Sequence, residues 1–349
     1  MTKLTKRQIY ILNLIRQSGH ISNREIKPKI AARFGEISRV TIVRDIEVLL
    51  QNNLIQKQGS GRSLVYVEKL INPLLKYYPV EDYFSQEQDE RSDQVIHFNF
   101  AVLDWIDNVF SKDELYHLTK LNQVYQRKIK NMTKTAYQKE LERWLIELSW
   151  KSSRIEGNTY TLIDTEILIK EKKEATGHTR EEAIMILNHK NALEYIIANR
   201  IKFKKLKLNL IEHIHKLLTK ELNVKSGLRQ KLVRIVGTNY QPLSNMYQIK
   251  ETLIRMIKKI NRISDPFSQA FLSILFIAYT QPFEDGNKRT SRLIGNAMML
   301  ANDLCPMSLR TIDEVEYKKA MILFYEQNSA RYFKELFIKQ FEFAVNNYF

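Results

Sequence analysis

The spacing of apolar residues at the start of the chain predicts a small helical domain. Three segments carry apolar residues three and four positions apart, the spacing of one helix face: residues 5–17, 23–34 and 39–52. Ser22 and Ser38 stand where the second and third helices need an N-cap. Residues 54–67 then alternate around a glycine-containing turn, which is typical of a β-hairpin. Three helices followed by a hairpin predict a winged-helix domain over residues 1–70.

The pattern changes after residue 70 and then becomes almost entirely helical. Prolines at positions 73 and 79 and an acidic run at 81–93 interrupt any periodicity, so we expect a linker over residues 71–94. One exception follows within the helical region. Residues 231–236, K-L-V-R-I-V, alternate in the manner of a strand and lead into a glycine turn, which predicts a short hairpin. The expected fold class is mainly α: a helical bundle over 95–349 with a small β-hairpin, preceded by the winged helix.

Residues 278–292, A-Y-T-Q-P-F-E-D-G-N-K-R-T-S-R, join two apolar helical segments by a tight turn. The turn delivers Asn287, Lys288 and Arg289 to the first turn of a helix, where unpaired N–H groups and the helix dipole attract anions. This arrangement predicts a phosphate site. Asp285, with Glu284 as a further candidate, is placed to hold a Mg²⁺ ion that bridges phosphates. A charged helix cap with ordinary surface ion pairs is the alternative, and spacing alone does not decide between them.

Composition narrows the class of protein. Charged residues make up 27% of the 349 positions and hydrophobic residues 44%, as in ordinary globular proteins. The single cysteine, Cys305, excludes an intrachain disulfide and a cysteine zinc site. We find neither a signal peptide nor a run of roughly 20 apolar residues, so we expect a cytoplasmic protein without a membrane partner. The formal net charge of +16 suits a nucleic-acid partner.

The turn resembles the signature of the Fic family, written H-P-F-x-D-G-N-G-R-x-x-R. Seven positions match it: Pro282, Phe283, Asp285, Gly286, Asn287, Arg289 and Arg292. Two do not. Gln281 stands at the family's catalytic His, and Lys288 stands at its second Gly, where the related Doc branch also has Lys. The resemblance covers roughly residues 95–345.

This resemblance implies transfer of a phosphate-containing group, usually AMP from ATP, to a Ser, Thr or Tyr hydroxyl of a target protein. It implies that Asp285 binds Mg²⁺ and that Arg292 holds the γ-phosphate. The remaining phosphate contacts would come from Gly286, Asn287, Lys288 and Arg289. A carboxamide at Gln281 has no basic nitrogen near neutral pH, and a positioned base is typically worth roughly 10²–10⁴ in rate. Lys288 leaves open whether AMP or phosphate is transferred.

Two further segments resemble Fic elements. Residues 149–158 contain the pattern [S/T]-x-x-x-E-[G/N] of an autoinhibitory helix, here Ser152, Glu156 and Gly157. In the family its Glu forms a salt bridge with the last signature Arg, here Arg292, and so occupies the place of a phosphate. The predicted hairpin resembles the Fic flap, which lies over the active site and pairs with the target; its residues here include Val233, Ile235 and Gly237.

Residues 40–49 resemble the recognition helix of DeoR-type winged-helix regulators. This likeness implies that Arg39, Thr41 and Arg44 face a DNA groove, while Lys57 and Arg62 of the hairpin contact phosphates. The alternative is a winged helix used for protein contacts or dimerisation.

The sequence therefore leaves two functional hypotheses. The first is an autoinhibited Fic-type transferase that uses ATP and Mg²⁺ and is slowed by Gln281. The second is a catalytically inactive, ATP-sensing transcriptional regulator that binds duplex DNA. A second copy of the chain, in a homodimer, is a further candidate partner.

Overall fold

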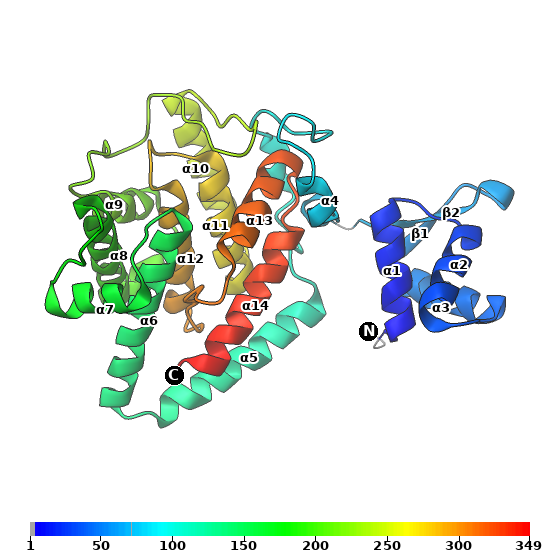
Figure 1. Cartoon of the computed structure of the whole chain (residues 1–349), viewed down its shortest axis with the longest axis horizontal. Coiled ribbons are helices and arrows are strands. Elements are labelled where there is room, and N and C mark those ends of the chain that lie inside the picture. The colour runs from blue at the N-terminus through cyan, green and yellow to red at the C-terminus, as the bar shows by residue number, and fades with distance from the viewer. Residues whose placement is uncertain (1–3, 71) are drawn as a thin grey trace. The chain divides into compact units, whose positions relative to one another are not determined.

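The computed structural model describes residues 4–70 and 72–349. It separates into two compact units, Met1–Gln86 and Glu87–Phe349 (Figure 1). The division falls inside the segment that the sequence marks as a linker, 71–94. Each unit is described by itself below.

The N-terminal unit begins with three helices and a hairpin. The helices are α1 (Lys6–Ser18), α2 (Asn23–Phe34) and α3 (Arg39–Gln51), and the strands are β1 (Ile55–Gln58) and β2 (Val65–Glu68), with η1 (Gly61–Ser63) between them. The strands pair antiparallel, with Ile55 opposite Glu68. Thr5, Ser22 and Ser38 cap the three helices through their side chains, as their positions before each apolar pattern require. Two short elements follow, η2 (Pro73–Leu75) and α4 (Val80–Phe84).

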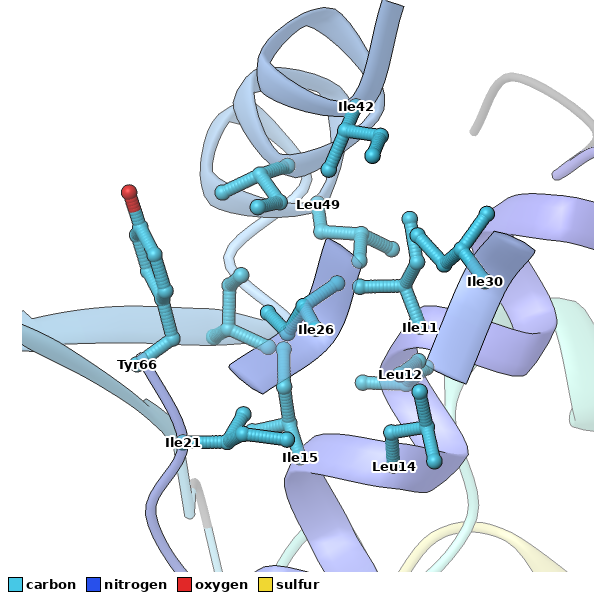
Figure 2. Close-up of a cluster of buried hydrophobic side chains, with 12 residues drawn as sticks. Ile11, Leu12, Leu14, Ile15, Ile21, Ile26, Ile30, Ile42, Leu49 and Tyr66 are labelled. Atoms are coloured by element: carbon cyan, nitrogen blue, oxygen red, sulfur yellow. The ribbon is translucent and has the colours of Figure 1, made fainter. Parts of the chain in front are cut away.

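One hydrophobic core holds this unit together (Figure 2). Each helix contributes its apolar stripe, and Tyr66 of β2 covers one side. Ile21, before α2, exchanges two backbone hydrogen bonds with Tyr66, at 3.1 and 2.8 Å, which fixes the hairpin against the helices. Two ion pairs add to this: Arg7 with the buried Asp45, and Arg16 with Glu68 at 2.7 Å. The order of elements is the one that a winged helix requires.

The C-terminal unit is helical among its described residues, which confirms the mainly α fold class. Its helices are α5 (Lys112–Asn131), α6 (Lys134–Ile155), α7 (Leu162–Glu171), α8 (Arg180–Ala198), α9 (Leu208–Leu218), α10 (Met246–Ile260), α11 (Pro266–Thr280), α12 (Asn287–Ala301), α13 (Glu314–Gln327) and α14 (Arg331–Asn347). Two short 3₁₀ turns, η3 (Phe100–Asp104) and η4 (Arg200–Lys204), complete it. No described helix is long and apolar enough to cross a membrane.

Helices α11 and α12 form the centre of this unit (Figure 1). Every residue of α12 except Lys288 is buried, and α12 also contacts α6, α8 and α9. Gly295 permits the close approach of α11, because a Cβ atom there would lie 2.4 Å from Cγ1 of Ile274. Two tightly packed helices thus fix both ends of the turn at residues 281–286.

The segment expected to form the flap hairpin does not pair with itself. No strand is assigned between α9 and α10, and the backbone of Leu232–Val236 makes no hydrogen bond with any described residue. The second half of the segment pairs elsewhere: Gln241 forms an isolated parallel bridge with His97, and its N–H donates to the carbonyl of Ile96 at 2.7 Å. The alternating sequence therefore produces an extended, unpaired segment rather than a closed hairpin.

Candidate functional site

The turn between α11 and α12 is braced from within. Gln281 ends α11 in the left-handed region (φ 47°), and Gly286 begins α12 there as well (φ 77°). The Asn287 side chain accepts a hydrogen bond from the Phe283 N–H at 2.9 Å and donates to the Phe283 carbonyl at 2.8 Å. The resemblance implied that Asn287 holds a phosphate, but here its amide shapes the turn that presents the phosphate site.

A buried histidine of α9 packs against the turn and hydrogen-bonds to its backbone. His215 of α9 stacks on Phe283, with ring centroids 3.7 Å apart and planes 9° from parallel. Its Nε2 donates to the Asp285 carbonyl at 3.0 Å. Burial lowers the pKa of His215 to about 4, although the Asp285 carbonyl opposes that shift. His215 is therefore neutral near pH 7 and serves as a support. The sequence showed it only as one of two histidines on an apolar helix.

Arg229 ties the turn to the flap segment, and the sequence analysis did not single it out. This buried guanidinium donates from Nε to the Gln281 carbonyl at 2.6 Å, from Nη1 to the Lys231 carbonyl at 2.8 Å, and from Nη2 to the Leu243 carbonyl. The backbone N–H of Arg229 donates to the Pro282 carbonyl at 3.0 Å. One side chain thus holds both ends of the flap segment, 231–243, against the turn.

A buried ion pair joins the turn to α6. Arg292 is 1% exposed and donates to Oε1 of Glu156 at 2.8 Å. It also donates to Oγ of Ser152 at 2.9 Å and to the Ser152 carbonyl at 2.8 Å. Lys288, at the position where the family has Gly, lies 3.1 Å from Oε2 of Glu156. Each oxygen of this carboxylate therefore has its own cation.

The two cations decide the ionisation of Glu156. Burial raises the pKa of this carboxyl, but the charges of Arg292 and Lys288 outweigh burial and lower the pKa to about 2. The Glu156 side chain is consequently an anion at any physiological pH. Gly157 follows at φ 99°, a conformation that favours glycine and that ends α6 with Glu156 facing the turn.

A cavity of about 420 Å³ opens beside this ion pair. Most of the predicted Fic site residues line it: Glu156, Gly157, Val233, Ile235, Gln281, Asp285, Gly286, Asn287, Lys288 and Arg289. Arg292 and Ser152 lie buried behind Glu156, and Gly237 lies outside the lining. The end of α6, the flap segment and the turn at residues 281–286 are thus brought to one place, although they are far apart in the sequence.

The cavity carries the features of an anion site. Arg289 is 2% exposed, and its Nη2 donates to Oδ2 of Asp285 at 3.1 Å. Its Nη1, although buried, has no hydrogen-bond partner among the described residues. No side chain caps the N-terminus of α12, because Gly286 occupies the N-cap. An unused guanidinium N–H beside an uncapped helix N-terminus is the chemistry that a phosphate satisfies.

Mg²⁺ would find the carboxylates of Asp285 and Glu284 here, since both residues line the cavity. The Asp285 side chain is 68% exposed, and no group of three or more metal-ligating side chains occurs among the described residues. Mg²⁺ typically keeps several waters and is held by one or two carboxylates together with substrate phosphates. These two carboxylates beside an anion site fit that requirement.

No base lies at the position of the family's His. The Gln281 amide donates to the Ala278 carbonyl at 2.6 Å. Tyr325 also lines the cavity, and burial raises the pKa of its hydroxyl well above 10. His178 is hydrogen-bonded to Thr159 at 2.8 Å and does not line the cavity, so it does not supply a base there either.

The candidate DNA-contacting residues lie in the other unit. Arg39 and Arg44 of α3 are exposed, as are Lys57 and Arg62 of the hairpin. None of the four forms an ion pair with a described acidic residue, whereas Arg7 and Arg16 of the same unit do. Thr41 is partly buried, and its hydroxyl lies 2.9 Å from that of Ser38.

Comparison with known proteins agrees with this geometry. Residues 205–299, which include the flap segment and the turn, match the model of the Fic/DOC family. The chain is 25% identical over 275 residues to the protein adenylyltransferase Fic of Nematostella vectensis, an alignment that covers 78% of this chain and 60% of the relative. Residues 205–299 of the chain are thus similar to the Fic/DOC family. It is also 22% identical over 168 residues to the protein adenylyltransferase fic-1 of Caenorhabditis elegans, covering 47% of this chain and 33% of that protein. The chain thus spans less than two thirds of either relative.

Solved structures show the same Fic fold. Fic-1 from C. elegans (residues 134–508) superposes with a TM-score of 0.58 at 19% identity, covering 68% of this chain and 70% of that one. A Fic-domain-containing signalling protein from Bacteroides thetaiotaomicron gives 0.57 at 15% identity, covering 67% and 94%. The shared fold is the helical bundle that carries the signature turn.

The ionised Glu156 makes the stability of the C-terminal unit (Glu87–Phe349), called the Fic unit below, depend on pH. A carboxyl whose pKa falls from 4.5 to about 2 on folding adds stability above pH 4.5 and loses it as the pH drops toward 2. We expect Glu156→Gln to lower the free energy of unfolding by about 3 kcal/mol at pH 7. The difference from the wild type should shrink steadily between pH 4.5 and pH 2. All three tryptophans lie in the Fic unit, so tryptophan fluorescence during urea unfolding measures it.

The matched control is Glu171→Gln, which removes an exposed carboxylate at the end of α7. It should leave the unfolding free energy within about 0.5 kcal/mol of the wild type at each pH. A Glu156→Gln deficit that stays constant down to pH 2 would contradict the pairing described here.

Proposed function

We propose that this chain is an ATP-dependent Fic-type transferase that modifies a hydroxyl group of a target protein and is held inactive by Glu156. The observation that carries the proposal is the ion pair at the end of the cavity: Glu156 takes up both Arg292 and Lys288, while the adjacent Nη1 of Arg289 stays unpartnered. Two relatives are named protein adenylyltransferases, which favours AMP as the transferred group. Lys288 keeps phosphate transfer as the alternative.

The features of the cavity favour binding of a nucleoside triphosphate whose phosphates lie toward α12. Arg289 and the first N–H groups of α12 would hold the phosphates, and Asp285 would hold Mg²⁺. Arg292 would hold the terminal phosphate once Glu156 leaves it. Because a carboxylate and a phosphate compete for the same guanidinium, the negative charge of Glu156 is itself the inhibitor.

The chain's own contribution to catalysis is position and charge. ATP would supply the transferred group, with pyrophosphate leaving when AMP is transferred and ADP leaving when phosphate is transferred, and Mg²⁺ held at Asp285 would neutralise part of the phosphate charge. Gln281 orients the target hydroxyl beside the cavity but does not take its proton, since a carboxamide has no basic nitrogen. Tyr325 does not take it either, because its own proton is held to high pH. The proton therefore leaves to solvent or to the transferred group, so the reaction is slow but retains the benefit of positioning.

Removal of the inhibitor should expose the nucleotide site. We expect Glu156→Gly to tighten ATP binding more than ADP binding, because only the terminal phosphate gains Arg292. In the Glu156→Gly background, Arg289→Ala should weaken ATP roughly 10- to 150-fold, the equivalent of about 1.5–3 kcal/mol for a charge-assisted contact. Titration calorimetry with Mg²⁺ measures both, with the exposed Arg262→Ala as a control that should change nothing. An absence of ATP binding by Glu156→Gly would remove the basis of the proposal.

Restoration of a base should restore transfer. We expect the Glu156→Gly, Gln281→His double variant to label protein at least roughly 100-fold faster than Glu156→Gly alone, since a positioned imidazole acts as a general base near neutral pH. α-Labelled ATP detects AMP transfer, and label from γ-labelled ATP alone indicates phosphate transfer.

The matched control for this experiment is Glu156→Gly with Gln281→Asn, which changes the side chain without supplying a base. If the double variant binds ATP yet labels nothing, the chain is a nucleotide sensor rather than a transferase. Equal labelling with Gln281 intact would show that no base is needed at this position.

A second candidate function is DNA binding by the N-terminal unit. Its favouring observation is that Arg39, Arg44, Lys57 and Arg62 are exposed and lack acidic partners, in a unit with the element order of a winged helix. Surface cations without internal partners are available to phosphates. This function is compatible with the transferase and would place its activity under the control of DNA occupancy, or the reverse.

The full chain should bind duplex DNA with an affinity that falls steeply with salt. We expect Arg39→Ala and Arg44→Ala each to weaken binding several-fold and to reduce the slope of log affinity against log salt by about one. Fluorescence anisotropy from 50 to 200 mM salt measures this. Arg127→Ala, an exposed arginine of α5, is the control. A full chain that binds no duplex at low salt would favour the protein-contact alternative for this unit.

A further inference from the structure

The flap segment is held at its ends and free between them. Arg229 bonds the carbonyls of Lys231 and Leu243, and Arg91 donates to the carbonyl of Gly237 at 3.0 Å. Between these anchors, the backbone groups of Leu232–Val236 make no hydrogen bond with the described chain. Fixed, unpaired backbone beside a cavity is a ready template for a strand from another molecule.

The side chains of this edge alternate in exposure. Val233 and Ile235 are partly buried in the wall of the nucleotide cavity, whereas Arg234 and Val236 border the same cavity but are exposed. Leu232 and Val236 are 68% and 96% exposed, large fractions for apolar residues. Between them lies Arg234, also exposed, and no described acidic residue pairs with it. The outward face therefore presents an apolar residue, a cation and an apolar residue in order.

A groove continues this outward face on the Leu232 side. It measures about 340 Å³ and is lined by the apolar side chains of Phe98, Phe100, Pro242 and Leu243 together with Leu232. Phe100 is 43% exposed, so a large apolar surface is left uncovered beside the edge. An apolar side chain of a partner strand would remove apolar surface from water here, which favours binding.

We infer that the target of this enzyme docks on the flap as an extended segment in which one neighbour of the modified hydroxyl residue is acidic and the other is large and apolar. The inference rests on the proposed function, because it takes the cavity as the place where the hydroxyl reacts. It adds which sequence around the hydroxyl this chain selects.

The pattern follows from strand geometry. Successive side chains of a strand point to opposite faces, and residues directly opposite one another on paired strands interact. A target residue opposite Val233 faces the cavity, and its two neighbours then lie opposite Leu232 and Arg234. A target residue opposite Ile235 has neighbours opposite Arg234 and Val236. In both registers one neighbour meets a cation and the other an apolar side chain.

The occupant is a target segment rather than a second copy of this chain. Two flap edges related by a two-fold axis centred on Arg234 would set two arginines opposite each other, and like charges directly opposite are destabilising. An acidic residue in that place instead supplies the charge that Arg234 lacks within its own chain.

The test compares peptides on the activated full chain, Glu156→Gly with Gln281→His. Four fluorescent peptides share one extended frame and one central Tyr, and differ in the two flanking residues: Leu and Glu, Leu and Lys, Ser and Glu, or Ser and Lys. Anisotropy measures binding without any need for transfer, and label from ATP measures transfer. We expect the Leu and Glu peptide to bind best, roughly fivefold better than the Leu and Lys peptide.

Charge reversal then tests Arg234 itself. Arg234→Glu should invert the preference between the Glu and Lys peptides, and Leu232→Ser should remove the preference for Leu over Ser. Both readouts are ratios between peptides on one protein, so a general loss of nucleotide affinity cancels. Arg262→Glu is the control and should leave the ratios unchanged.

The possible outcomes distinguish failure of the docking inference from failure of the proposed transferase function. Selective binding without label would support the docking surface and count against the transferase. Label without selectivity, or a preference unchanged by Arg234→Glu, would overturn the docking inference and leave the transferase standing. A dimer seen by sedimentation that Arg234→Glu dissociates, with no peptide bound, would identify a second copy as the occupant and likewise overturn the inference.

Discussion

The Fic unit depends on neutralising a charge that it buries. Arg292 lies on a helix whose residues are almost all inside the protein, so its guanidinium has no access to bulk water. The counter-charge comes from Glu156, 136 positions earlier, and both oxygens of Ser152 accept further hydrogen bonds from the guanidinium. A buried cation that loses its partner is strongly destabilising. Any state in which Glu156 departs therefore needs another anion in its place.

This requirement links stability to function at one residue. The Glu156–Arg292 contact contributes to folding, so in the function proposed above the inhibited form is the stable form in the absence of a ligand. A triphosphate is a suitable replacement because it brings more negative charge than the carboxylate it displaces. Lys288 strengthens the closed arrangement beyond a single pair, since it gives the second oxygen of Glu156 a cation of its own. In the proposed function, the departure from the family's glycine would thus act on regulation as well as on the fit of the nucleotide.

The sequence predicted those parts of the site that depend on neighbouring residues. The two helices, the glycine turn and the cations at the start of α12 follow from local spacing, and the family resemblance added the distant partner Glu156. Arg229 and His215 escaped prediction because each is a single polar residue whose partners are backbone carbonyls, which no side-chain pattern records. The flap hairpin was expected from alternation alone. Alternation indicates an extended chain but does not say which strand it joins, and here Gln241 pairs with the segment at His97 instead. Asn287 is a further example, because an asparagine side chain can either bind a ligand or hydrogen-bond the backbone of a turn. The sequence does not distinguish these two roles.

Arg229 has a consequence for how the two halves of the site communicate. Its guanidinium bonds the turn at the Gln281 carbonyl and the flap segment at both ends, so neither can shift without straining the same three hydrogen bonds. Linkage between two binding sites is reciprocal. By whatever factor a docked segment alters nucleotide affinity, the nucleotide must alter the affinity for that segment by the same factor. The enzyme would then sense its two substrates jointly, through one buried side chain that touches neither.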